Sequence, residues 1–201
     1  MGKTGNAERV LRLASERGSL RPRDLAGHQI PRTTLSRLVE SGRLIQISRG
    51  LYALPDHSRS EQHQLADVAV RSPQGIFCLL TALRFHDLTT QSPHELWLAI
   101  PNKAHPPKLD YPPLRVVRFS GEALTQGIET HVADGVSVRV YSVAKTVADC
   151  FKYRNKIGLD VALEALRESR REKRATNDEL WHYAKICRVA NVMRPYMESI
   201  E

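Results

Sequence analysis

Four polar side chains between residues 33 and 37 have types and spacing that suit the recognition of DNA. They are Thr33, Thr34, Ser36 and Arg37. In a helix, at about 100° per residue, Thr33 and Arg37 lie opposite an apolar face of Leu35, Leu38 and Val39, and the other two flank them. Small hydroxyl side chains let a helix approach base edges in the major groove, and an arginine binds guanine or phosphate. An ordinary solvated amphipathic helix is the alternative, although its surface would more commonly carry Glu and Lys.

The segment around these residues predicts a short helix followed by a β-hairpin. Pro31 suits the first position of a helix, and Gly42 suits the left-handed position after its end, so we expect a helix of about eleven residues. Residues 44–48 and 51–54 are short β-prone runs. They are separated by Arg49-Gly50, whose glycine tolerates the positive φ of a tight turn. We therefore expect a wing with Arg49 at its tip.

Two helices are predicted upstream of this segment. The first begins at Asn6 and stops at Gly18, and the second begins near Pro22 and ends at Gly27. Three helices with tight turns, followed by a hairpin, are the arrangement of a winged helix-turn-helix DNA-binding domain. The polar residues that follow mark a boundary, so we expect one domain at residues 1–56 and a second at 60–201.

The charge and cysteine content favour a nucleic-acid partner and a reducing compartment. The 201 residues carry a formal net charge of +8. Residues 1–56 hold ten basic and five acidic residues, a net of +5, against +3 for the remainder. The three cysteines are widely spaced among apolar residues, which indicates neither a disulfide framework nor a metal-binding pair. There is no apolar run long enough to span a membrane, so we expect a cytoplasmic protein without a membrane partner.

The second domain is predicted to contain an antiparallel sheet and C-terminal helices, which makes the whole chain α+β. Strands are expected at residues 95–100, 114–119, 128–132 and 136–141, and the Asp134-Gly135 pair predicts a hairpin between the last two. A helix capped by Ser142 and another over 159–174 follow. The capping-box spacing of Thr176 and Glu179 opens a last helix.

No common nucleotide, metal or hydrolase motif is present, so we expect neither an enzyme nor a cofactor. The pairs His57 and His63, and Cys78 and His86, lack the ligand spacing of a zinc module. Lys145 and Asp149 share a helix face, and a plain ion pair is favoured over a functional pair. Together with Lys152, these polar residues lie beside the apolar stripe of their helix. We expect this face to be the best candidate for contact with a partner protein.

The chain resembles the AbiEi family of antitoxins of type IV toxin–antitoxin, or abortive-infection, systems. The motifs are RTTLSRLVESGRLIQISRGLYALP in the first domain, then DGVSVRVYSVAKTVADCFKYRNKIGLDVALEALRE and RATNDELWHYAKICRVANVMRPY in the second. The resemblance implies a winged helix that represses its own operon at inverted repeats in double-stranded promoter DNA. It also implies a C-terminal domain that neutralises a nucleotidyltransferase-like toxin. The matching DNA-facing positions are Arg32, Thr33, Thr34, Ser36, Arg37 and Arg49.

Three functions therefore compete at the level of sequence. The first is a DNA-binding autoregulator and antitoxin. The second is a one-component repressor whose second domain senses a small ligand, and the third is a nucleic-acid enzyme. A neighbouring gene for a nucleotidyltransferase separates the first from the second, and metal- or nucleotide-dependent turnover would favour the third.

Overall fold

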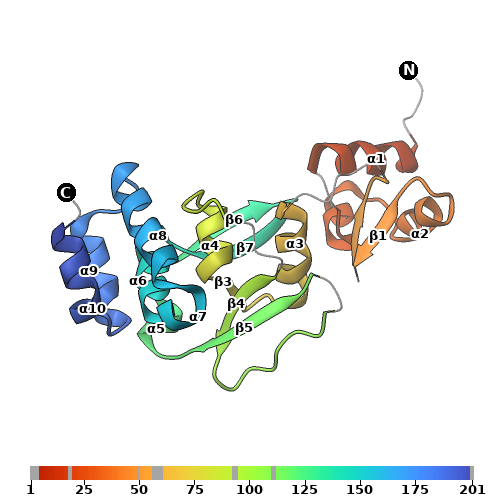
Figure 1. Cartoon of the computed structure of the whole chain (residues 1–201). Coiled ribbons are helices and arrows are strands. Elements are labelled where there is room, and N and C mark those ends of the chain that lie inside the picture. Colours follow the sequence, from red (N-terminus) through yellow and green to blue (C-terminus); the bar gives the residue numbers. More distant parts are fainter. Residues whose placement is uncertain are drawn as a thin grey trace. The chain divides into compact units, whose positions relative to one another are not determined.

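The computed structural model describes residues 5–17, 20–48, 50–55, 61–91, 95–109 and 112–199. The chain divides into two compact units, residues 1–71 with 132–138, and residues 72–131 with 139–201. The class is α+β, as the sequence predicts: N-terminal helices and a hairpin come first, then a five-stranded sheet and C-terminal helices (Figure 1).

The first unit begins with three helical segments and a hairpin. Helix α1 (Asn6–Arg17) is followed by a 3₁₀ helix, η1 (Pro22–His28), and by α2 (Thr33–Glu40). Strands β1 (Ile45–Ser48) and β2 (Leu51–Ala53) pair antiparallel, and helix α3 (Glu61–Arg71) follows. The second segment continues one residue beyond Gly27 as a 3₁₀ helix and is closed by Gln29 in the left-handed conformation. Helix α2 is shorter than the sequence predicts, because Pro31 and Arg32 contribute only carbonyl acceptors to its first turn.

A small apolar core holds these elements together. Its buried members come from α1, η1 and α2 and from the segments that connect them to one another and to β1: Val10, Ala14, Leu20, Leu25, Ile30, Leu35, Leu38 and Leu44. A β-bridge between Leu20 and Tyr52, with backbone hydrogen bonds of 2.7 and 2.9 Å, ties the connection between α1 and η1 to β2. These bonds hold the hairpin against the helical segments in addition to its covalent connection to α2.

The sheet has the order β5-β4-β3-β7-β6. Its strands are β3 (Ile76–Phe77), β4 (Leu96–Pro101), β5 (Leu114–Phe119), β6 (Ile128–Ala133) and β7 (Val136–Tyr141). Strand β3 pairs antiparallel with β4, and β6 returns as β7 through Asp134 and Gly135, both of which have positive φ. A two-residue connection of this kind joins antiparallel strands. The β4–β5 and β3–β7 pairs are parallel, a detail that the sequence did not indicate.

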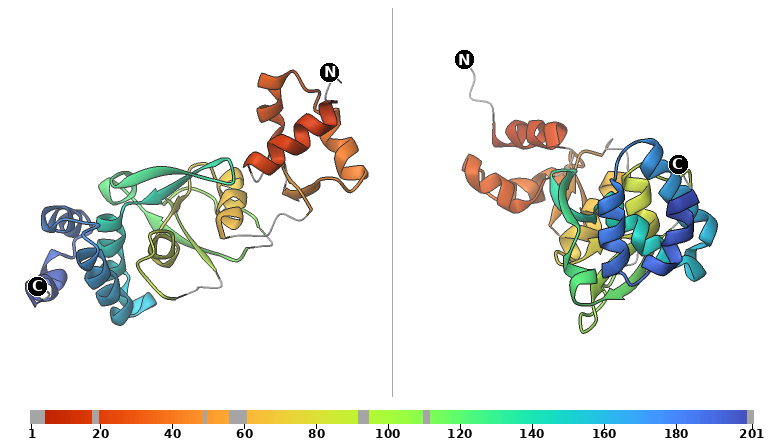
Figure 2. Two further views of the ribbon diagram at one scale, coloured as in Figure 1. Left: turned by 90° about the horizontal axis from the view of Figure 1, so that it is seen from above. Right: turned by 90° about the vertical axis from the view of Figure 1, so that its left-hand side faces the viewer.

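Helix α6 (Val143–Lys152) is the centre of the second unit. It contacts α4 (Leu79–Phe85), α7 (Arg154–Ile157), α8 (Leu159–Arg171), α9 (Asn177–Ile186) and α10 (Ala190–Ser199). Every α6 residue from Val143 to Phe151 is buried as a result. Both views in Figure 2 show the C-terminal helices gathered around it. A short helix, α5 (Glu122–Thr125), connects β5 to β6.

The end of the chain differs from the single last helix that the sequence predicts. The Thr176–Glu179 capping box is present and opens α9, as expected. That helix ends at Ile186, and Arg188 takes a positive φ before α10 begins at Ala190. Because α10 contains Pro195, its sequence lacks a clear helical signature.

Candidate functional site

Helix α2 has one buried and one exposed face, as its sequence predicts. Leu35 and Leu38 are 1% and 3% exposed and belong to the apolar core. Arg32, Thr33, Ser36 and Arg37 are exposed, and Thr34 is half-buried. The 3.6-residue period places the two leucines together and leaves the hydroxyl and guanidinium groups on the opposite side. The structure therefore brings together five of the six residues that the sequence assigns to DNA.

The guanidinium groups of Arg32, Arg37 and Arg43 have no ion-pair partner in the part of the chain that the structure describes. All three side chains are exposed, and Arg43 lies just after the helix. By contrast, Arg12 on α1 lies 3.9 Å from Glu16. An unpaired exposed arginine can bind a phosphate or a base edge without first breaking an internal ion pair. Sequence reasoning passed over Arg43, although it follows Gly42 directly at the end of the helix.

The hairpin has the geometry that a wing requires. Gly42 and Gly50 have φ of +69° and +76°, the left-handed values predicted for the helix end and the turn. The β1–β2 register shifts between Gln46 and Ser48, so the hairpin carries an irregularity next to its turn. Arg49, assigned to the wing tip by the sequence, lies outside the described residues. Its role remains a prediction.

Lys145 and Asp149 form a buried ion pair. The ammonium nitrogen of Lys145 lies 2.6 Å from Oδ2 of Asp149, and the two side chains are 0% and 1% exposed. The Sγ of Cys187, on the segment after α9, donates to Oδ1 of the same carboxylate at 3.2 Å. The Tyr141 ring centroid lies 4.0 Å from the Lys145 nitrogen and completes its surroundings. This is the internal i,i+4 pair that the sequence favoured.

The burial of Lys145 and Asp149 corrects the expectation that this face of α6 contacts a partner protein. A contact surface needs exposed side chains, whereas two of its three members, Lys145 and Asp149, lie inside the unit. Only Lys152 is exposed. The neighbouring helices that bury α6 are the physical reason, because they cover the face on which the first two residues lie.

Burial also governs the titration of this cluster. It raises the pKa of Asp149, against the opposing attraction of Lys145. It raises the pKa of Cys187 to about 12, and it raises those of Cys78 and Cys150 well above their ordinary value. The three thiols are free and buried. They are therefore packed as neutral groups and are poor nucleophiles at neutral pH.

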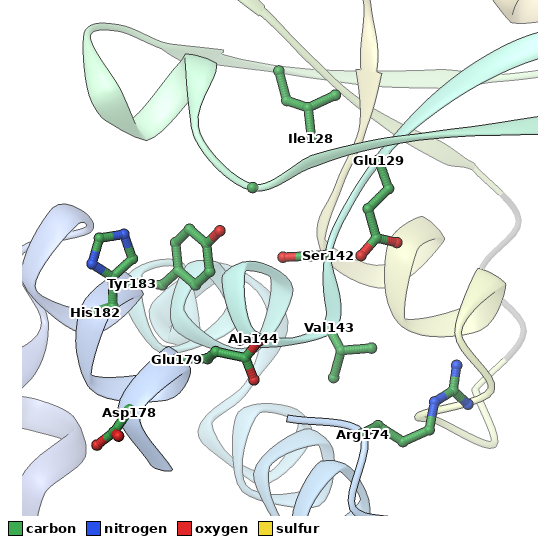
Figure 3. Close-up of a pocket in the computed structure, with 11 residues that line it drawn as sticks. Ile128, Glu129, Ser142, Val143, Ala144, Arg174, Asp178, Glu179, His182 and Tyr183 are labelled. Atoms are coloured by element: carbon green, nitrogen blue, oxygen red, sulfur yellow. The ribbon is translucent and has the colours of Figure 1, made fainter. Parts of the chain in front are cut away.

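A pocket of about 610 Å³ opens beside the N-terminus of α6 (Figure 3). Sequence reasoning did not find it, because its walls come from segments far apart in the chain. The lining residues lie at the start of β6, at the start of α6, and around the α9 cap: Gly127, Ile128, Glu129, Ser142, Val143, Ala144, Arg174, Asp178, Glu179, His182 and Tyr183. All of them belong to the second unit.

The described residues contain neither a candidate metal cluster nor a candidate membrane-spanning helix. Within the described ranges, His, Cys, Asp and Glu side chains form no group of three or more that could hold a metal ion. In the same part of the chain, none of the helices combines the length and apolar character needed to cross a membrane.

Three N-terminal helical segments and a hairpin, with Arg37 exposed on α2 and unpaired among the described residues, define a winged helix-turn-helix of the kind found in DNA-binding regulators. Residues 8–55 match the family described as "Transcriptional regulator, AbiEi antitoxin". This match confirms the resemblance to the AbiEi antitoxin transcriptional regulators in the N-terminal part of the chain. Residues 134–196, which also carry the resemblance, lie outside the matched segment. Among curated proteins, none matches the chain.

Proposed function

We propose that the protein binds double-stranded promoter DNA through α2 and represses its own operon. The observation that carries this proposal is the exposed polar face of α2, in which Arg32 and Arg37 have no ion-pair partner among the described residues. Thr33 and Ser36 are small enough for the helix axis to come close to base edges. Arg37, near the middle of the exposed face, is assigned to a base, and Arg32, at the N-terminal end, to a phosphate.

The family supports the regulatory part of this proposal. AbiEi antitoxins are described as transcriptional regulators, and the matched residues 8–55 contain all of α2 and both wing strands. Sites with inverted repeats, implied by the resemblance, would be bound by two copies of the chain. The domain of residues 1–56 would supply the DNA contacts.

We assign neutralisation of a nucleotidyltransferase-like toxin to the domain of residues 60–201. Family membership supports this assignment at the level of an antitoxin. The contact surface for a toxin must use exposed side chains, so the Lys145–Asp149 pair is not part of it in the folded state. Lys152, exposed at the end of α6, remains a candidate.

An electrophoretic mobility shift of the full chain on its own promoter DNA tests the DNA-binding proposal. Affinity should fall steeply as salt rises, because neutralised phosphates release their counterions. Arg32→Ala should reduce the slope of log affinity against log salt by about one unit. Arg171→Ala, which removes an exposed arginine on α8 in the other unit, is the matched control and should leave the slope unchanged. A salt-independent shift, or equal slopes for both variants, would refute the assignment.

Co-expression with the adjacent gene tests the antitoxin proposal. The full chain should restore growth to cells in which that gene is toxic. Lys152→Ala, compared at matched soluble protein levels with the exposed α8 variant Arg171→Ala, should weaken the rescue if Lys152 contacts the toxin. Full rescue by Lys152→Ala would exclude this residue. Lack of rescue by the unmodified chain would instead favour a repressor that is not an antitoxin.

A further inference from the structure

The pocket beside α6 has a positively polarised wall. The helix begins at Val143 and its first intrahelical bond runs from the N–H of Thr146 to the carbonyl of Ser142. The N–H groups of Val143 and Ala144 therefore have no acceptor within the helix, and the helix dipole adds partial positive charge at this end. Both residues line the pocket.

Ser142 occupies the capping position of α6 without capping it. Its side chain makes no bond to the helix N–H groups, and its Oγ is buried without a hydrogen-bond partner among the residues that the structure describes. In Figure 3 this hydroxyl points into the space shared with Tyr183. A buried hydroxyl that lacks a partner costs free energy, which a bound acceptor would recover. Ser142 is thus a second observation, besides the helix end, that points to an acceptor in the pocket.

The rest of the lining is net negative, because Glu129, Asp178 and Glu179 outnumber Arg174. Glu179 accepts bonds from the N–H and hydroxyl of Thr176, both at 2.8 Å, and these bonds lower its pKa, so it is ionised at neutral pH. Glu129 holds His131 through Oε2 at 3.1 Å, whereas its Oε1 makes no hydrogen bond to another described residue. Figure 3 shows the Glu129 carboxylate reaching from β6 toward Ser142. This part of the lining favours a donor with positive charge.

We propose that this pocket binds a small zwitterion, an α-amino acid, with its carboxylate at Ser142 and the α6 N-terminus and its ammonium group at Glu129. The net negative charge of the side chains in the lining disfavours a simple anion, and the positive end of α6 disfavours a simple cation. A molecule that carries both charges on neighbouring atoms satisfies both parts of the lining. The volume of about 610 Å³ lies in the range of small-molecule sites. This site is independent of the DNA-binding face on α2.

Isothermal titration calorimetry of the full chain tests the proposal. The probes are glycine, L-alanine, L-leucine, L-glutamate and L-lysine at millimolar concentration, with acetate and methylammonium as carriers of a single charge. At least one amino acid should bind and raise the melting temperature, and neither single-charge probe should do so. Two results would overturn the assignment. One is that acetate or methylammonium releases as much heat as the amino acids do, and the other is that none of the five amino acids releases heat.

Two variants locate the site. Ser142→Ala removes a hydroxyl that has no hydrogen-bond partner among the described residues, so this variant should fold normally. It should nevertheless weaken amino-acid binding by about ten- to a hundredfold. Glu129→Gln should weaken binding to a similar degree by removing the charge that meets the ammonium group. Ser137→Ala and Glu122→Gln change exposed residues outside the pocket and are the matched controls. Unchanged binding in both pocket variants would show that the ligand binds elsewhere.

Discussion

The ammonium group of Lys145 faces the carboxylate of Asp149 across one turn of α6, 2.6 Å apart and out of contact with solvent. Two charges taken out of water lose several kcal/mol of hydration each, and only their mutual attraction and further hydrogen bonds offset this. Here Cys187 supplies such a bond to the carboxylate, and the Tyr141 ring lies against the ammonium group. The pair therefore couples α6 to the segment after α9.

Removing one member of this pair should destabilise the protein strongly. Lys145→Ala leaves Asp149 buried without its partner and should lower the free energy of unfolding by about 3–5 kcal/mol. Lys145→Met combined with Asp149→Leu removes both charges and should recover most of that loss. Urea unfolding followed by circular dichroism measures both. Lys152→Ala, an exposed change on the same helix, is the control and should stay within about 0.5 kcal/mol of the unmodified chain. A double variant as unstable as the single one would show that packing, rather than charge, dominates.

Alkaline pH should destabilise the fold through its buried thiols. The pKa of Cys187 is raised by burial from 9.0 to about 12, so the folded state holds this proton over a range in which the unfolded state releases it. The contribution is fully present below pH 9 and is lost as pH rises toward 12. Over that range the free energy of unfolding of Cys187→Ala should decrease with pH less steeply than that of the unmodified chain, by about 1.4 kcal/mol per pH unit. Urea midpoints at pH 8 and pH 10 compare the two proteins. Identical pH slopes would contradict this assignment of the proton.

Gly127 should tolerate alanine far less than Gly121 does. Both glycines have positive φ, +72° and +56°, which L side chains rarely adopt, so either substitution strains the backbone. A Cβ at Gly121 meets open space, whereas at Gly127 it would lie 2.8 Å from Cβ of Lys145 and 3.0 Å from Cε1 of Tyr183. Gly127→Ala should therefore lose about 1–3 kcal/mol more stability than Gly121→Ala. The difference in their melting temperatures gives the measurement, and equal values would mean that β6 shifts freely at this point.

On DNA, Arg37 on α2 and Arg49, which the sequence places at the wing tip, should behave differently. Arg37→Ala should cost about 1–3 kcal/mol on the cognate site and relax specificity at one base pair, because we assign this exposed arginine of α2 to a base. Arg49→Ala should weaken all sequences alike, as expected of a phosphate contact. Competition binding against operator and random duplexes separates the two outcomes. Equal losses on both duplexes for Arg37→Ala would disprove base reading.

Features set by neighbouring residues were predictable from the sequence. The left-handed turns at Gly42 and Gly50, the Asp134-Gly135 hairpin and the Thr176–Glu179 capping box all appear where their local patterns place them. The same holds for the exposed and buried faces of α2. Backbone preferences and hydrophobic periodicity act over a few residues, so a single sequence contains their causes.

Tertiary structure alone decided what surrounds α6. The sequence pattern of a lysine and an aspartate four residues apart is the same whether solvent or other helices cover the pair. They are buried here because α8, α9 and α10 pack around the helix. The parallel strand pairs and the pocket at Ser142 likewise depend on segments distant in sequence, from Phe77 beside Val140 to Gly127 beside Lys145. Their positions follow from how the whole domain buries its apolar surface, a property of the assembled fold that no local pattern contains.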